Sequence, residues 1–271
     1  LNKDQKIAYD HLEWPLLIIA WAGSGKTATV TARIQNMVQN KNITWSEILA
    51  VTFTNKAALE MKERIGKALW VTYSKNPFQN RWFPFIWTFH SLGIFILKEV
   101  FEKFDNINIW ISKNFIIYDE SDKMSVIKSI MRDDLKLDEK KYPARSIASY
   151  ISNAKNALIS AKQYANYVDS HIKEIVRDAY LIYDKKMTEN NALDFDDILV
   201  KTLEALKHDN VIEYYWEKYK FIMVDEYQDT NAPQYEIVKL LASKYRNLVV
   251  VWDDWQCLTP DTIIETETWN K

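Results

Sequence analysis

The feature that most constrains this chain is the segment "PLLIIAWAGSGKTATV", residues 15–30. A short apolar run leads into a loop that holds Gly23 and Gly25, and helical spacing follows the Gly-Lys-Thr sequence. Strand, glycine-bearing loop and helix in this order are typical of phosphate-binding loops, whose backbone N–H groups surround the phosphates. The segment therefore predicts an α/β domain with a phosphate site between a strand and the helix that follows it.

Each residue type in this loop has a chemical role. The ammonium of Lys26 reaches the β- and γ-phosphates of a nucleotide, and the hydroxyl of Thr27 is a ligand for Mg²⁺. Trp21 is unexpected in a loop that brings its backbone close to phosphate, although its position is formally variable, and Ala20 stands where the general pattern has its first glycine. We expect the nucleotide to be bound by Ala20, Trp21, Ala22, Gly23, Ser24, Gly25, Lys26 and Thr27.

The rest of the chain shows two kinds of pattern. Strand-like runs at 47–54, 85–89, 220–226 and 247–254 alternate with helical runs at 55–69 and 232–245, as in a parallel sheet. Between about 92 and 190 the periodicity is helical and strand-like alternation nearly disappears. We therefore expect an α/β domain made of residues 1–91 and 191–256, with residues 92–190 inserted as an all-helical subdomain.

An acidic pair follows the apolar run "FIMV" at residues 221–224. Asp225 is placed to hold Mg²⁺, and Glu226 to orient or deprotonate an attacking water. Such a pair is by itself often only a solvated loop. Together with the upstream Gly-Lys-Thr sequence it favours a site that hydrolyses a nucleoside triphosphate.

Composition excludes several other classes. The 271 residues are 48% hydrophobic and 27% charged, and no run approaches the length of a membrane span, so we expect a soluble cytoplasmic protein with no membrane partner. One cysteine and four histidines leave no disulfide and no Cys/His zinc cluster. Because the net charge is −2, any nucleic-acid binding requires a local patch.

Read in order, the segments "LNKDQKIAY", "AWAGSGKT", "AVTFTNKAALEMKERI", "TFHSLG", "LDFDDIL", "VDEYQDTN" and "VVWDDWQ" resemble the N-terminal half of superfamily 1 DNA helicases of the UvrD/Rep/PcrA type. The resemblance covers residues 1–256. It implies a RecA-like P-loop NTPase domain with a helical insertion, ATP and Mg²⁺ as cofactors, and 3′ to 5′ translocation along single-stranded DNA. It also implies duplex junctions, and repair or replication proteins, as partners.

The resemblance assigns further residues by position. Gln5 matches a glutamine that reads adenine, and Gln256 matches one that senses the γ-phosphate. Residues that match the DNA-binding positions are Thr52, Phe53, Thr54, Asn55, Thr88, Phe89 and His90. Aromatic rings offer a stacking surface to bases, and hydroxyls and amides meet phosphates, but a lone Phe53 or Phe89 is also a candidate core residue. Asp194, Phe195, Asp196 and Asp197 match another motif, in which helix capping is an alternative role for Asp194.

After "DDWQ" the chain departs from the family. Residues 257–271 resemble the opening block of an intein, with Cys257 as the splicing nucleophile and Thr262 as its assistant at the scissile amide. The alternative is an ordinary thiol in a divergent tail. We expect the intein and the second RecA-like domain to be incomplete or missing in this chain, so that the fragment alone does not unwind DNA.

Glycine and tryptophan usage is unbalanced. Average composition predicts roughly 19 glycines in a chain of this length, whereas the chain has 4, against 11 tryptophans. Tryptophan stands where the family usually has glycine at Trp21, Trp87 and Trp252, and by the same comparison at Trp14 and Trp110. Trp269 stands where the intein block tolerates glycine in a turn. We hypothesise that one codon that means glycine in the source was translated as tryptophan. The alternative is a set of genuine tryptophans.

Two other functions remain open at this stage. A nucleic-acid-binding module could keep the fold without turnover, and a helicase subunit of a helicase–nuclease would carry the same motifs. DNA-stimulated ATP hydrolysis separates the first from a helicase, and the downstream sequence separates the second.

Overall fold

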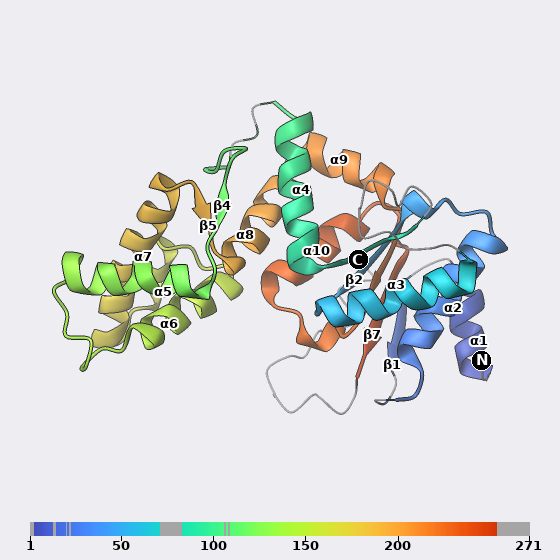
Figure 1. Ribbon diagram of the computed structural model, residues 1–271, viewed down its shortest axis with the longest axis horizontal. Coiled ribbons are helices and arrows are strands. Elements are labelled where there is room, and N and C mark those ends of the chain that lie inside the picture. Colours follow the sequence, from blue (N-terminus) through green and yellow to red (C-terminus); the bar gives the residue numbers. More distant parts are fainter. Residues whose placement is uncertain are drawn as a thin grey trace. The chain divides into compact units, whose positions relative to one another are not determined.

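The structure is a computed structural model that describes residues 3–12, 15–19, 21, 23–70, 83–105, 107 and 109–253 (Figure 1). Its described residues form two compact units. The first, here called the sheet unit, draws on Leu1–Phe89, Glu213–Thr230 and Leu241–Lys271, and the second, the helical unit, consists of His90–Ile212 and Asn231–Leu240.

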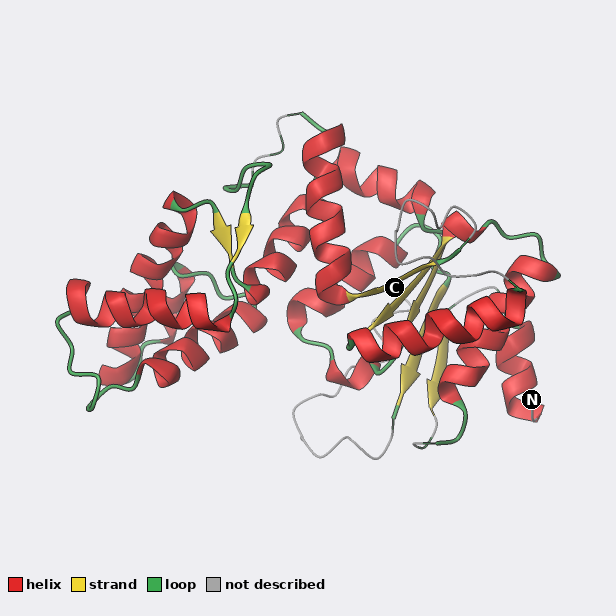
Figure 2. Ribbon diagram, viewed as in Figure 1, coloured by secondary structure: helices red, strands yellow, loops and turns green. Residues whose placement is uncertain are grey.

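The sheet unit is built around a five-stranded parallel sheet (Figure 2). Its strands are β1 (Leu16–Ile19), β2 (Ile48–Thr52), β3 (Phe85–Thr88), β6 (Phe221–Val224) and β7 (Leu248–Trp252), in the spatial order β1-β7-β6-β2-β3. Helices α1 (Lys3–Asp10), α2 (Lys26–Gln39) and α3 (Asn55–Leu69) belong to the same unit. The predicted α/β class is confirmed, and the carboxyl ends of all five strands lie along one edge, where such sheets bind ligands.

Burial explains why these apolar runs form strands. All five residues of β2 are buried, as expected for a parallel strand covered on both faces. The core of the sheet unit combines side chains of α2, α3, β2 and β6, among them Ile34, Met37, Ile48, Met61 and Met223. These contacts fix the positions of the strand ends that carry the polar residues.

The helical unit contains α5 (Glu120–Ser129), α6 (Ala144–Asn156), α7 (His171–Glu189) and α8 (Phe195–Leu206), with most of α4 (Phe89–Lys103). Helices α9 (Asp209–Lys218) and α10 (Ala232–Ala242) each begin in this unit. It also has a two-stranded parallel sheet of β4 (Ile116–Ile117) and β5 (Ala192–Leu193), so the expectation of an all-helical insertion is wrong at this point. Strands of two residues are too short to produce a recognisable alternation.

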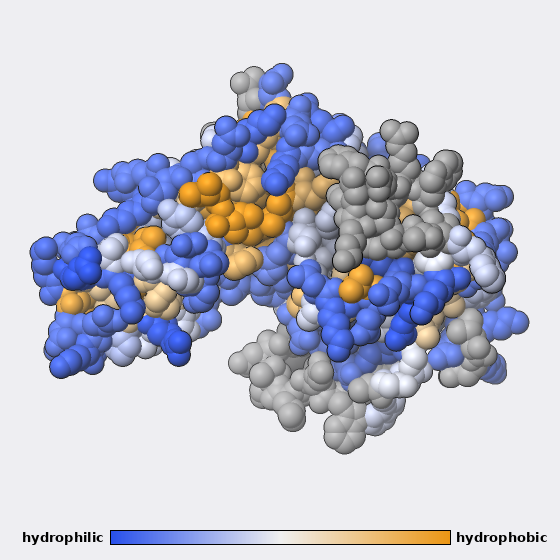
Figure 3. All heavy atoms as spheres, viewed as in Figure 1, coloured by the Kyte–Doolittle hydropathy of each residue, from blue (hydrophilic) through white to orange (hydrophobic). Residues whose placement is uncertain are grey.

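The helical unit extends beyond the expected boundary at residue 190. Helix α8 packs against α6 and β5, and the buried side chains of Asp194 and Asp197 both contact Lys155 of α6. These contacts are internal to the helical unit, whose first segment runs to Ile212. No helix in the described part of the chain is both long and apolar enough to cross a membrane, and most of the visible surface is hydrophilic (Figure 3).

Several tryptophans occupy unusual positions. Trp70 follows α3 in the left-handed conformation, with φ of 59°, and its side chain is 94% exposed. This helix-ending conformation strongly favours glycine. Trp21 is also exposed, whereas Trp87, Trp110 and Trp252 are half-buried and Trp14 and Trp269 lie outside the described residues. Trp70, which was not among the predicted positions, therefore becomes a further candidate for a miscoded glycine.

Candidate nucleotide-binding site

The loop between β1 and α2 has the backbone that a phosphate cradle requires. Gly23 and Gly25 have φ of 79° and 92°, a region that side chains disfavour. The N–H of Ser24 donates to the carbonyl of Trp21 at 3.1 Å, which closes the turn. Gly25 is the N-cap of α2 and has no side chain over the helix start. The first N–H groups of α2 and the positive end of its dipole therefore favour an anion here.

Gln5 lies against this loop. Its Nε2 donates to the carbonyl of Ser24 at 3.1 Å, and a Cβ atom at Gly25 would come within 3.0 Å of the same nitrogen. A pocket of about 360 Å³ beside them is lined by residues of α1, β1 and the loop, including Asp4, Gln5, Trp21, Ser24 and Lys26. Its volume is in the range of small-molecule sites. Glycine at position 25 thus leaves the room that Gln5 occupies.

Lys26 is held by a carboxylate that sequence reasoning did not single out. Its Nζ donates to Oδ2 of Asp253 at 2.6 Å, and both side chains are buried. Asp253 follows β7, the strand that pairs with β1, so the sheet order brings the two residues together. The available signal was the carboxylate after a second apolar strand, which parallel pairing places at the same edge.

Asp225 follows β6 at the same edge and is buried. Its N–H donates to the carbonyl of Val51, which extends the pairing between β6 and β2 by one residue. Burial, and then the charge of Glu226, raise the pKa of the Asp225 carboxyl above its ordinary value, while the Glu226 N–H and the Lys26 ammonium act in the opposite direction. A desolvated carboxylate with this environment would gain from a bound cation.

Glu226 has a strained backbone and a fixed side chain. Its φ of 56° places a non-glycine residue in the left-handed region, and such outliers cluster at functional sites. Nε2 of Gln228 donates to its Oε2 at 2.6 Å, and Oε1 of Gln228 accepts from the N–H of Asp253 at 3.1 Å. Gln228, a second residue that sequence reasoning missed, therefore ties the position of Glu226 to the end of β7.

The residues present fit the expected cofactors. Magnesium usually takes one or two protein carboxylates or hydroxyls together with phosphate oxygens and waters. Thr27 in the first turn of α2 and Asp225 after β6 supply donors of these kinds. Among the described residues no group of three or more His, Cys, Asp or Glu side chains could hold a metal ion. That finding is compatible with an ion held partly by a nucleotide.

Four of the residues predicted to bind DNA lie close together in the structure. Thr52 and Thr88 are register partners on β2 and β3, and the Phe53 and Phe89 rings meet edge to face with centroids 5.4 Å apart. Thr52, Thr88 and Phe89 are buried, however. Phe89 therefore supports the half-buried Phe53 ring and does not offer a stacking face itself.

The accessible members of this group are Phe53, Thr54, Asn55 and His90. The hydroxyl of Thr54 accepts from the N–H of Ala57 and caps α3. In the helical unit, burial lowers the pKa of His90, opposed by the charge of Asp196, and its ring lies edge to face with Phe195 at 5.7 Å. Ala20, Ala22, Gln256, Cys257 and Thr262 lie outside the described residues, so their predicted roles, the intein included, remain predictions.

A parallel sheet with a glycine cradle after β1, a buried lysine at the start of α2 and a carboxylate pair after β6 defines a RecA-like P-loop NTPase domain. Comparison with known proteins narrows this class: residues 1–258 match the family described as UvrD/REP helicase N-terminal domain. The chain belongs to this family.

Among curated proteins, the chain is similar to the ATP-dependent DNA helicase PcrA of several bacteria. It is 41% identical to the protein of Bacillus subtilis over 266 residues, which is 95% of this chain and 33% of the relative. Identity is 40% to the Staphylococcus aureus protein, over 95% of this chain and 34% of the relative, and 40% to that of Leuconostoc citreum, over 93% and 32%. The chain thus spans about a third of the length of these relatives.

Proposed function

We propose that this chain is the ATP-binding part of an ATP-dependent DNA helicase that translocates 3′ to 5′ along single-stranded DNA. The observation that carries the proposal is that Lys26, Asp225 and Glu226 follow strands β1 and β6 at the same edge of the sheet, with the positive-φ glycines in the loop after β1. The similarity to PcrA helicases supports DNA as the polymer along which ATP hydrolysis drives movement.

The chain's own residues have distinct tasks in this proposal. Bound Mg·ATP supplies the transferable γ-phosphoryl group and the metal that neutralises its charge. The amides of residues 23–27 would hold the phosphates, together with the Lys26 ammonium. Thr27 and Asp225 would hold Mg²⁺. Glu226, steadied by Gln228, would orient the attacking water and accept its proton.

The carboxyl ends of β2 and β3 would form part of the DNA track. Phe53 is half-buried and supported by Phe89, which leaves one aromatic surface for a base. Thr54 and Asn55, exposed at the start of α3, offer a hydroxyl and an amide to phosphates. The predicted ATP-hydrolysing residues and the predicted DNA-binding residues follow strands of the same sheet. ATP hydrolysis and DNA binding would therefore share one rigid support.

ATP turnover of the full-length protein, with and without single-stranded DNA, tests this function. A helicase hydrolyses ATP faster with DNA and displaces the strand of a duplex with a 3′ single-stranded tail, and a 5′-tailed duplex of the same sequence is the control. DNA binding without turnover would instead identify a non-catalytic binding module. Cleavage of the DNA by the native complex would identify a helicase–nuclease subunit.

A further inference from the structure

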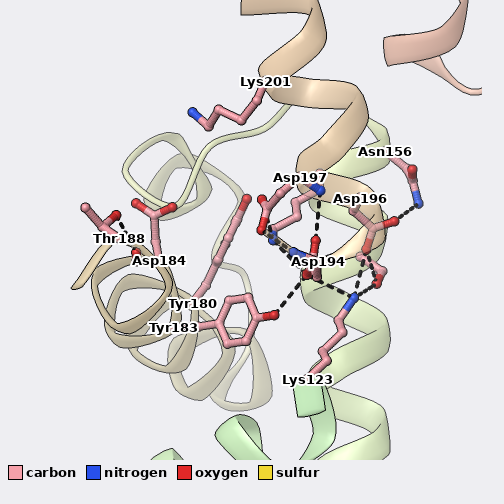
Figure 4. A network of polar contacts seen from close by, with 12 residues as sticks. Lys123, Asn156, Tyr180, Tyr183, Asp184, Thr188, Asp194, Asp196, Asp197 and Lys201 are labelled. Carbon is pink, nitrogen blue, oxygen red and sulfur yellow. Dashed lines mark hydrogen bonds and ion pairs between the residues drawn. The ribbon is translucent and has the colours of Figure 1, made fainter. Parts of the chain in front are cut away.

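A buried polar network holds the start of α8 in the helical unit (Figure 4). Nζ of Lys123 lies 2.8 Å from Asp196 and 3.3 Å from Asp194, and Nζ of Lys155 lies 2.9 Å from Asp194 and 2.7 Å from Asp197. Asp194 and Asp197 also form a capping box at the first turn of α8. Because breaking such buried pairs is costly, the network fixes where α8 begins relative to α5 and α6.

Two residues at which the chain enters the helical unit are linked to this helix start, one by direct contact and one through Asn156. One entry is at His90, whose ring contacts Phe195. The other is at Asn231, whose Nδ2 donates to Oδ1 of Asn156 on α6 at 2.7 Å. Nδ2 of Asn156 in turn approaches Oδ1 of Asp196 at 3.5 Å, which is the longer of these two hydrogen bonds (Figure 4).

The segment that leads from Glu226 to Asn231 is short and internally bonded. Tyr227–Asp229 form a single 3₁₀ turn, and the hydroxyl of Thr230 donates to the carbonyl of Tyr227 at 2.8 Å. Gln228, inside this turn, bonds the Glu226 side chain. A displacement of Asn231 would therefore be passed along the turn to Gln228 and Glu226, because the N–H of Asp229 donates to the carbonyl of Glu226 at 3.0 Å and restrains the turn.

Asn231 is also fixed in orientation. Its N–H donates to Oε1 of Gln234, and the N–H of Gln234 donates to its Oδ1, both at 3.0 Å. The side-chain oxygen is thereby committed to the start of α10, and the amide nitrogen is directed to Asn156. The assignment of oxygen and nitrogen in Asn231 follows from these bonds.

We propose that the hydrogen bond between Asn231 and Asn156 is a coupling bridge, through which the DNA-bound state of the protein controls the placement of Glu226. The inference rests on the proposed function and deepens it. Asn156 and Asn231 are positioning residues, since neither belongs to the nucleotide cradle. Breaking the bridge removes the stimulation of hydrolysis by DNA and leaves the binding of DNA and the DNA-independent turnover in place.

The test uses the full-length protein and its Asn156→Ala, Asn231→Ala and doubly substituted variants. For each, ATP turnover is measured without DNA and with saturating single-stranded DNA, and DNA affinity is measured separately. We expect the stimulation ratio to fall about fivefold or more in each single variant, the lower end of typical coupling between sites. The stimulation ratio of the double variant should be no lower than that of the worse single variant, because the bond between Asn231 and Asn156 is already absent from both single variants.

Asn153→Ala is the matched control, since Asn153 is exposed on the same helix α6 and should leave the ratio unchanged. The inference is overturned if the folded single variants keep the wild-type ratio within twofold, or if the two losses multiply. Should Asn156→Ala not fold, Asn231→Ala, which breaks the bond from the other side, decides alone. A wild-type protein without DNA stimulation would contradict the proposed function itself.

Discussion

The Nζ atom of Lys26 lies 2.6 Å from Oδ2 of Asp253, and both side chains are buried where β7 and the β1 loop end. The lysine expected to meet phosphate thus has a protein carboxylate as a partner in the structure. A phosphate that binds here would either displace Asp253 from Lys26 or contact Lys26 alongside Asp253. Asp253 therefore lies at the predicted phosphate site, although its carboxylate and a phosphate both carry negative charge.

Asp253→Asn should lower the free energy of unfolding by about 1–3 kcal/mol, because it removes the carboxylate that accepts from the buried ammonium of Lys26 at 2.6 Å. Mg·ATP should recover part of the loss by supplying phosphate charge to Lys26. Urea unfolding with and without nucleotide measures both effects. Asp133→Asn, which breaks the exposed pair with Arg132, is the control and should leave stability unchanged within error. Equal effects of the two substitutions would contradict this account.

Asp225→Asn should raise stability near neutral pH while it abolishes turnover. The pKa of Asp225 is raised by burial and by Glu226, so the folded state binds the proton more tightly than the unfolded state. Ionisation of this carboxyl therefore costs stability, and the cost grows as pH rises above the ordinary aspartate pKa. The variant lacks this cost, so its advantage in thermal midpoint should shrink as pH falls. An advantage that is independent of pH would contradict the assignment.

Phe53→Ala and Phe89→Ala should have different effects. Removal of the half-buried Phe53 ring takes away a stacking surface, worth about 1–3 kcal/mol of single-stranded DNA affinity. Removal of the buried Phe89 ring should instead lower the free energy of unfolding by about 3–5 kcal/mol. DNA titration and urea unfolding of both variants separate the two roles. Loss of DNA affinity only in the stably folded Phe89 variant would reverse them.

Trp70→Gly should stabilise the protein by about 0.5–1 kcal/mol. The left-handed backbone at position 70 costs a residue with a side chain about 1–2 kcal/mol, a cost that glycine avoids. Glycine loses more backbone entropy on folding, which offsets part of this stabilisation. Little packing is lost, because Trp70 is 94% exposed. Trp45→Gly is the control and should be destabilising, since Trp45 stacks on Phe83. A stability loss at position 70 would show that Trp70 makes contacts of its own.

Peptide mass spectrometry of the native protein tests the miscoding hypothesis directly. Peptides that cover positions 21, 70, 87 and 252 should contain glycine at these sites. Tryptophan at position 21 would refute the hypothesis for the loop.

Local patterns predicted the loop, the strands of the five-stranded sheet and the carboxylate pair, because each is written in a few consecutive residues. The pairing of Lys26 with Asp253 joins residues 227 positions apart and depends on β7 lying next to β1. Strand order is not encoded in any local pattern, so this pair was missed. The extension of the helical unit past residue 190 was missed for a similar reason, since Lys155 pairs with Asp194 and Asp197 between separate helices.

The burial of Phe89 was left open for a related reason. Its place directly after a strand fits both a core ring and a base platform, and only the packing against Phe53 decides between them. At position 70 a tryptophan hides the glycine signal by which a helix end is ordinarily recognised.

Turnover of the full-length Glu226→Gln variant tests the central claim most directly. Glutamine keeps the size of the side chain and its bond to Gln228 but cannot accept a proton from water. We expect DNA-stimulated ATP hydrolysis to fall at least 100-fold, the contribution typical of a general base, with nucleotide and DNA binding retained. Glu102→Gln, on the exposed face of α4, should leave turnover unchanged. Hydrolysis by Glu226→Gln at the wild-type rate would contradict the assignment of this site.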